Sequence, residues 1–160
     1  MTALLLAAVL WLPADPPDPC GLVSPAEITA ALGVKPAPGN RAGLTRDEES
    51  SADVDSCSIL LGEMFLEIGV AEFATPAAAA AALKETERVS PEIAEGIQMS
   101  PAAGLADGAL WGANADGAIW MTRKGKYMLN TTLAGQAGDG SKYRDQLKRL
   151  ATIALARLQE

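Results

Sequence analysis

The first twenty residues place the strongest constraint on this chain. An apolar run over residues 3–12 leads into a Pro/Asp-rich stretch that ends at Cys20. The run is short for a membrane span and has the length of the apolar core of a secretory signal. We therefore predict a signal peptide over residues 1–14 and a single exported domain over residues 15–160, periplasmic or secreted. An uncleaved membrane anchor and a buried helix remain alternatives, because no basic residue precedes the run and Leu12 is large for its place before the cut.

Export bears directly on the only two cysteines, Cys20 and Cys57. Disulfides form and persist in oxidising compartments. We expect these residues to form one structural disulfide, which would add about 4 kcal/mol of stability in the chain-entropy treatment. A reactive thiol would instead require a cytoplasmic protein. Lipid attachment at Cys20 is disfavoured, because Pro and Asp residues precede it in place of small apolar ones.

Composition excludes several classes of function. The chain carries 13 Lys and Arg residues against 20 Asp and Glu residues, a formal net charge of −7. This charge disfavours nucleic-acid binding and adsorption to anionic lipid. Histidine is absent, which rules out Ser-His-Asp triads, Cys-His pairs and His-ligated zinc. We predict no metal site and no cofactor.

Local patterns in the first half predict a helix, a hairpin and a second helix. Ser24 begins a capping box, and Gly33 is a typical helix end. The expected elements are a helix over 24–33, a weak strand near residue 34 or over 42–45, strands over 56–61 and 64–73, and a helix that begins at Pro76. The segment 90–105 is interpreted as a loop with one short strand at 97–99, because Pro91 and Pro101 are expected to break regular structure.

A short repeat marks the second half. The pattern Ala-Asp-Gly-Ala, then Leu or Ile, then Trp occurs at 106–111 and again at 115–120. The spacing fits a hairpin whose turn, 114–117, places Trp111 opposite Trp120. A third strand is expected over 127–133. An apolar stripe predicts a final helix over 141–158 that lies on a sheet.

Together these elements predict an α+β fold. Short hairpin connections favour antiparallel pairing, so we expect a single antiparallel β-sheet with helices packed mainly on one face and one disulfide. Cys20 precedes the first helix and Cys57 begins a central strand. The disulfide would therefore pin that helix to the sheet.

Candidate contact residues lie in the last hairpin. Its strands are apolar on both faces, with Trp120 on one face and Met121 on the other. A sheet covered on one side would leave part of this surface exposed, and exposed apolar patches mark partner or ligand sites. We therefore predict that Trp111, Trp120 and Met121 contact a ligand or partner. The alternative is that these side chains simply pack in the core.

The N-terminal segment carries a family resemblance. The stretch Asp-Pro-Cys at 18–20, the short helix that follows and the Leu-Gly at 32–33 resemble a family of small exported bacterial domains of unknown function, common among actinobacterial lipoproteins. Cys57 matches that family's second cysteine, and residues 104–108 partly match its Gly-Leu-Gly-Asp turn. Extracellular sensor domains of some mycobacterial membrane kinases are similar in outline. The resemblance implies an α+β fold with a disulfide and carries no catalytic residues, and the chain departs from it by lacking a lipid-attachment motif.

These observations favour an exported non-enzymatic domain that binds a ligand or protein partner in the cell envelope. Contact with a membrane is expected only if the leader stays uncleaved. One alternative is a hydrolase that uses two carboxylates in a cleft outside the cytoplasm, with carboxyl groups close together and raised pKa values. Another is a purely structural envelope protein.

Overall fold

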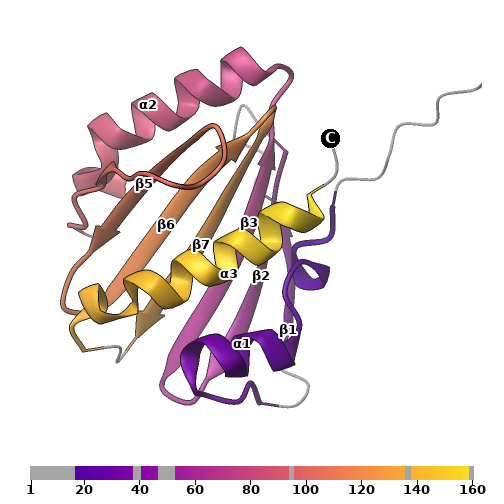
Figure 1. The fold of residues 1–160 in the computed structure, drawn as a ribbon, viewed down its shortest axis with the longest axis vertical. Coiled ribbons are helices and arrows are strands. Elements are labelled where there is room, and N and C mark those ends of the chain that lie inside the picture. Colours follow the sequence, from indigo (N-terminus) through magenta and orange to yellow (C-terminus); the bar gives the residue numbers. More distant parts are fainter. Residues whose placement is uncertain (1–16, 38–40, 47–52, 94–95, 136–137, 159–160) are drawn as a thin grey trace, which may run out of the picture.

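Among the residues that the structure describes, seven antiparallel strands form one sheet in the order β1-β2-β3-β7-β6-β5-β4 (Figure 1). This computed structural model describes residues 17–37, 41–46, 53–93, 96–135 and 138–158. The predicted signal peptide, residues 1–14, lies outside the described residues. The strands are β1 (Arg41–Arg46), β2 (Asp53–Leu61), β3 (Met64–Glu72), β4 (Ser100–Pro101), β5 (Gly108–Ala113), β6 (Gly117–Lys124) and β7 (Tyr127–Gly135). The α-helices are α1 (Pro25–Leu32), α2 (Pro76–Ile93) and α3 (Arg144–Arg157), and the 3-10 helices are η1 (Pro19–Gly21) and η2 (Gly140–Tyr143).

The hairpin between β5 and β6 has the predicted register. Trp111 pairs with Trp120, and their ring centroids lie 5.4 Å apart. The backbone N–H of Asn114 donates to the carbonyl of Gly117 at 2.9 Å, and the N–H of Gly117 donates to Asn114 Oδ1 at 2.9 Å. The turn chemistry therefore sets the register of this hairpin, as expected for a short loop.

Pairing of β3 with β7 joins the two halves of the chain into one sheet. The ladder runs from Met64 opposite Gly135 to Glu72 opposite Tyr127. Because successive side chains point to opposite faces, this register places Leu66 and Leu133 on the same face. Both are fully buried in the main core.

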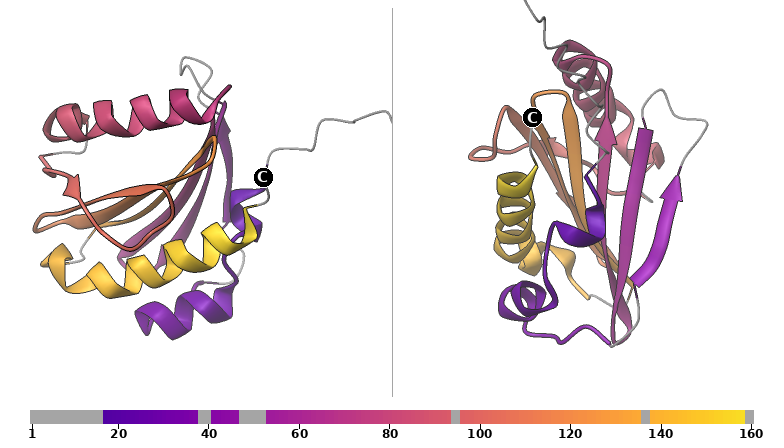
Figure 2. Two further views of the ribbon diagram at one scale, coloured as in Figure 1. Left: turned by 45° about the horizontal axis from the view of Figure 1, so that its top comes forward. Right: turned by 90° about the vertical axis from the view of Figure 1, so that its right-hand side faces the viewer.

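Helices α1 and α3 cover one face of the sheet, and α2 lies on the other (Figure 2). The main core lies under α3, where Leu147, Leu150 and Ala154 pack against Trp120 and Leu129. The predicted fold class, α+β with one antiparallel sheet and one disulfide, is confirmed. No helix among the described residues is both long enough and apolar enough to cross a membrane.

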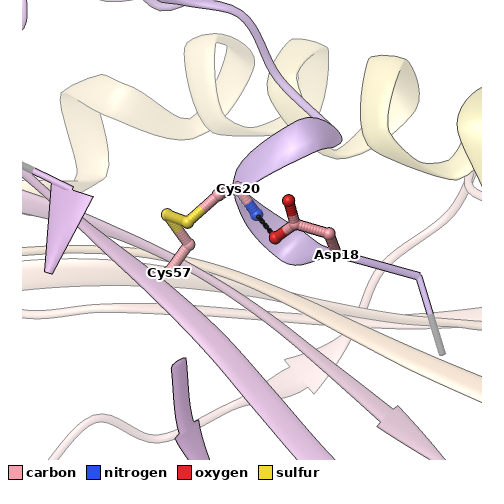
Figure 3. The surroundings of a disulfide bond; sticks show 3 residues. All are labelled: Asp18, Cys20 and Cys57. Atoms are coloured by element: carbon pink, nitrogen blue, oxygen red, sulfur yellow. Dashed lines mark hydrogen bonds between the residues drawn. A yellow bond between two sulfur atoms is a disulfide. The ribbon is translucent and has the colours of Figure 1, made fainter. Parts of the chain in front are cut away.

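The predicted disulfide between Cys20 and Cys57 is present, with a Cα–Cα distance of 5.2 Å (Figure 3). Cys57 is fully buried on β2, and Cys20 lies in η1. Asp18 is the N-cap residue of η1, and its Oδ1 accepts from the backbone N–H of Cys20 at 2.9 Å. The bond therefore fastens to the sheet the segment that leads into α1.

A second link joins α1 to the C-terminal end of α3. The Arg157 guanidinium donates to Glu27 Oε1 at 2.7 Å, to Glu27 Oε2 at 2.8 Å and to the carbonyl of Leu22 at 2.8 Å. Glu27 also completes the predicted capping box with Ser24. The hydrogen bond from Arg157, with those from Ser24, lowers the pKa of Glu27 to about 2.

The prediction that Pro91 breaks regular structure was wrong, because α2 continues to Ile93. Proline has no N–H to donate to the carbonyl four residues earlier, that of Glu87. The Ser90 hydroxyl donates to that same carbonyl at 3.2 Å. Ser90 Oγ also accepts from the backbone N–H of Met99 at 3.0 Å, which ties the following segment to α2. The short strand expected at 97–99 lies instead at β4.

Candidate ligand cleft

An open cleft of about 430 Å³ lies between α2 and the sheet, and we call it the α2 cleft. Helix α2 packs mainly on β5, β6 and β7, and the cleft lies on the side of the helix that faces β2 and β3. The lining residues come from α2, from β2, from β3 and the residue after it, and from β6 and β7: Ala82, Glu85, Thr86, Val54, Ala71, Phe73, Met121, Met128, Leu129 and Asn130.

A small second core holds α2 in this position. It consists of Ile97, Met99 and Leu110, with Leu83 of α2 packed against it. The buried hydroxyl of Ser90, bonded to Met99, fixes the far end of the helix. These contacts lie on one side of α2, which explains why the cleft opens on its other side.

The lining of the cleft is mainly apolar. Met121 and Met128 contribute flexible thioether side chains, which adapt to irregular ligand shapes. The polar groups are the hydroxyl of Thr86, the carboxylate of Glu85 and the amide of Asn130. Glu85 is paired with Arg88, whose hydrogen bonds lower the pKa of the Glu85 carboxyl. The cleft therefore combines an apolar surface with few polar groups, the usual character of a small-ligand site.

Asn130 links the cleft to a carboxylate farther along the sheet. Its Nδ2 donates to Glu67 Oε1 at 3.2 Å and to Thr132 Oγ1 at 3.3 Å. Gly69 lies opposite Asn130 in the ladder, and a Cβ at Gly69 would lie 2.0 Å from Asn130 Oδ1. The missing side chain at Gly69 therefore provides the space in which this amide sits.

The structure separates the three predicted contact residues. Met121 lines the α2 cleft, whereas Trp111 and Trp120 lie on the opposite face beside α3. Trp120 is 1 % exposed, and its Nε1 donates to the carbonyl of Arg144 at 2.8 Å. The Arg144 guanidinium lies 5.9 Å from the Trp111 ring. Trp120 can reach a ligand only if α3 moves, whereas Met121 lies in the wall of the cleft.

Sequence reasoning missed most of the cleft residues. Alternation along β7 could have found Met128, which the two-sided apolar pattern of the hairpin already placed on the Met121 face. No local signal indicates Ala82 or Phe73, because their role depends on where α2 lies. In the part of the chain that the structure describes, no cluster of three or more His, Cys, Asp or Glu side chains is arranged to hold a metal ion.

Comparison with known proteins shows a likeness in fold. No protein-family model matches the chain, and no curated protein matches it. The structure is similar to the crystal structure of the extracellular domain of PknH from Mycobacterium tuberculosis, with a TM-score of 0.52 and 9% sequence identity over 84% of this chain and 93% of that one. The expected similarity to an extracellular domain of a mycobacterial kinase is thus confirmed at the level of the fold.

Proposed function

We propose that this chain is an exported, non-enzymatic domain that binds a ligand, or an apolar part of a protein partner, in the α2 cleft. The observation that carries the proposal is the cleft itself, with its volume of about 430 Å³ and its mainly apolar lining. That volume falls within the roughly 300 to 1,000 Å³ typical of ligand sites. Met121, predicted from the sequence as a contact residue, lies in its wall.

Export is supported by the disulfide together with the apolar N-terminal run. A structural disulfide such as Cys20–Cys57, in which Cys57 is fully buried, is typical of oxidising compartments. The fold shared with an extracellular domain is consistent with the same location.

A non-enzymatic role is supported by the chemistry of the cleft. The hydrolase alternative requires two carboxylates that face each other, one of them with a raised pKa. Among the described lining residues, Glu85 is the only carboxylate, and its pKa is lowered by Arg88. A purely structural protein would bind no ligand in the cleft, and its open apolar surface would have no use.

The neutral dye Nile red tests the cleft by fluorescence titration. We expect saturable binding with a blue shift in emission, because the lining is apolar. The variant Ala82→Phe should weaken binding by about tenfold, since the ring occupies the space between α2 and the sheet. The control Ala81→Phe places the same ring on the exposed side of the same helix and should leave binding unchanged.

Thermal melting of both variants shows whether the fold is retained. If Nile red does not bind the wild-type protein, or if the two variants weaken binding equally, the cleft is not the binding site and the proposal fails.

A further inference from the structure

A strip of the sheet runs from the α2 cleft to the β2–β3 turn with no described helix upon it. In β3, Phe65, Glu67, Gly69 and Ala71 point to the same face, because side chains alternate along a strand. Ala71 already lines the cleft. Helix α2 lies near one end of the strands, and the β2–β3 turn lies at the other end (Figure 1). We call the face of β3 from Phe65 to Ala71, with Leu60 beside it, the β3 strip.

The far end of the β3 strip is apolar and exposed. Leu60 and Phe65 form a cross-strand pair on this face. Leu60 is 44 % exposed and Phe65 is 41 % exposed. Among the described residues, these are the large hydrophobic side chains that are exposed to solvent. Apolar side chains paired on an open face are typical of an interaction surface.

The middle of the β3 strip carries a negative charge. Glu67 is half-buried, and Asn130 Nδ2 donates to its Oε1 at 3.2 Å. No described Lys or Arg lies within ion-pair distance of Glu67, although the structure pairs Glu27, Glu72, Glu85 and Asp107 with cations. A half-buried carboxylate held by an amide and facing an open surface is complementary to a cation. The chain's net charge of −7 favours the approach of a basic partner.

The spacing of these features indicates the shape of the partner. From Phe65 to Ala71 the strand advances about 20 Å, at 3.3 to 3.4 Å per residue. Two apolar sites therefore lie at the ends of a long open surface, with Glu67 between them. An extended polypeptide presents alternate side chains on one face with the same rise, so its residues match these sites in register.

We propose that the β3 strip and the α2 cleft together bind an extended, basic polypeptide segment of a partner protein. One apolar side chain of the segment packs on Leu60 and Phe65. A Lys or Arg two positions away pairs with Glu67, and an apolar side chain about four positions farther on enters the α2 cleft. The inference rests on the proposed function, because the cleft forms one end of the site.

Selection from a phage-displayed library of random linear peptides on the immobilised full chain tests this inference. We expect enrichment of peptides with a Lys or Arg between two apolar residues at the proposed spacing. An enriched peptide is then synthesised and its affinity is measured by calorimetry. Glu67→Gln and Phe65→Ser should each weaken binding by about tenfold. The control Glu63→Gln, at the exposed turn beyond the strip, should leave the affinity unchanged.

The outcomes separate this inference from the proposed function. If Nile red binds the cleft but no basic peptide is enriched, the inference is overturned and the cleft keeps its role. The same holds if enriched peptides lose affinity in Ala82→Phe but not in Glu67→Gln or Phe65→Ser. Loss in all three variants, with retention in Glu63→Gln, supports the inference. If no basic peptide is enriched and Nile red does not bind either, both this inference and the proposed function are overturned.

Discussion

Removal of the Cys20–Cys57 disulfide by Cys20→Ala with Cys57→Ala is expected to lower the free energy of unfolding by about 4 kcal/mol. The bond joins residues with a sequence separation of 37. In the chain-entropy treatment, a loop of this length restricts the unfolded chain by about 13 cal/mol/K, which is about 4 kcal/mol at 25 °C. Alanine keeps an apolar side chain at the fully buried Cys57 position. The free energy lost from packing is therefore small compared with the chain-entropy contribution of the disulfide.

The same loss in the free energy of unfolding predicts a lower melting temperature. For a domain of this size, each 1 kcal/mol shifts the melting temperature by about 2 to 4 °C, so the double variant should melt about 8 to 16 °C lower. Circular dichroism melts of wild type and variant, each with and without dithiothreitol, measure this directly. Reductant should lower the melting temperature of the wild type and leave that of the variant unchanged. A variant that melts within about 2 °C of the wild type would refute the reasoning, because the bond would then restrict the unfolded chain very little.

Three further predictions concern single residues. Thr131→Val should raise the free energy of unfolding by about 1 kcal/mol, because the buried Thr131 Oγ1 has no hydrogen-bond partner among the described residues; a lower urea midpoint would contradict this. Ala106→Gly should stabilise by about 1 kcal/mol, because Ala106 has φ of 40° and glycine adopts that conformation without strain; an unchanged melting temperature would count against it. Glu27, whose pKa is lowered to about 2 by Arg157, should stabilise the fold fully above its ordinary pKa of 4.5 and lose that contribution as pH falls toward 2. Melting temperatures of Glu27→Gln should vary less over this pH range than those of the wild type, and equal slopes would exclude the link.

Features that depend on neighbouring residues could be predicted from the sequence. The capping box of Ser24 and Glu27 and the turn that places Trp111 opposite Trp120 are both as expected. Each depends on hydrogen bonds between residues close in the chain, so the residue types at those positions are sufficient. The stripe along α3 is likewise local, because helical periodicity shows which side is apolar.

The position of α2 could not be predicted in this way. Residues 77–82 are all alanine, so this part of the helix has no marked apolar stripe to show which face of a sheet it covers. Its extension through Pro91 depends on the Ser90 hydroxyl and on the packing of the segment that includes Met99.

The candidate site is also a product of tertiary structure. Glu67 and Asn130 are 63 residues apart in the sequence, and only the pairing of β3 with β7 brings them within hydrogen-bond distance. The sequence by itself determined α1, α3, the hairpins and the pairing of its only two cysteines, because short-range hydrogen bonds, periodicity and composition specify them. The tertiary structure decided the face that α2 covers, the cleft beside it and the carboxylate near that cleft, because these arise from contacts between segments far apart in the chain.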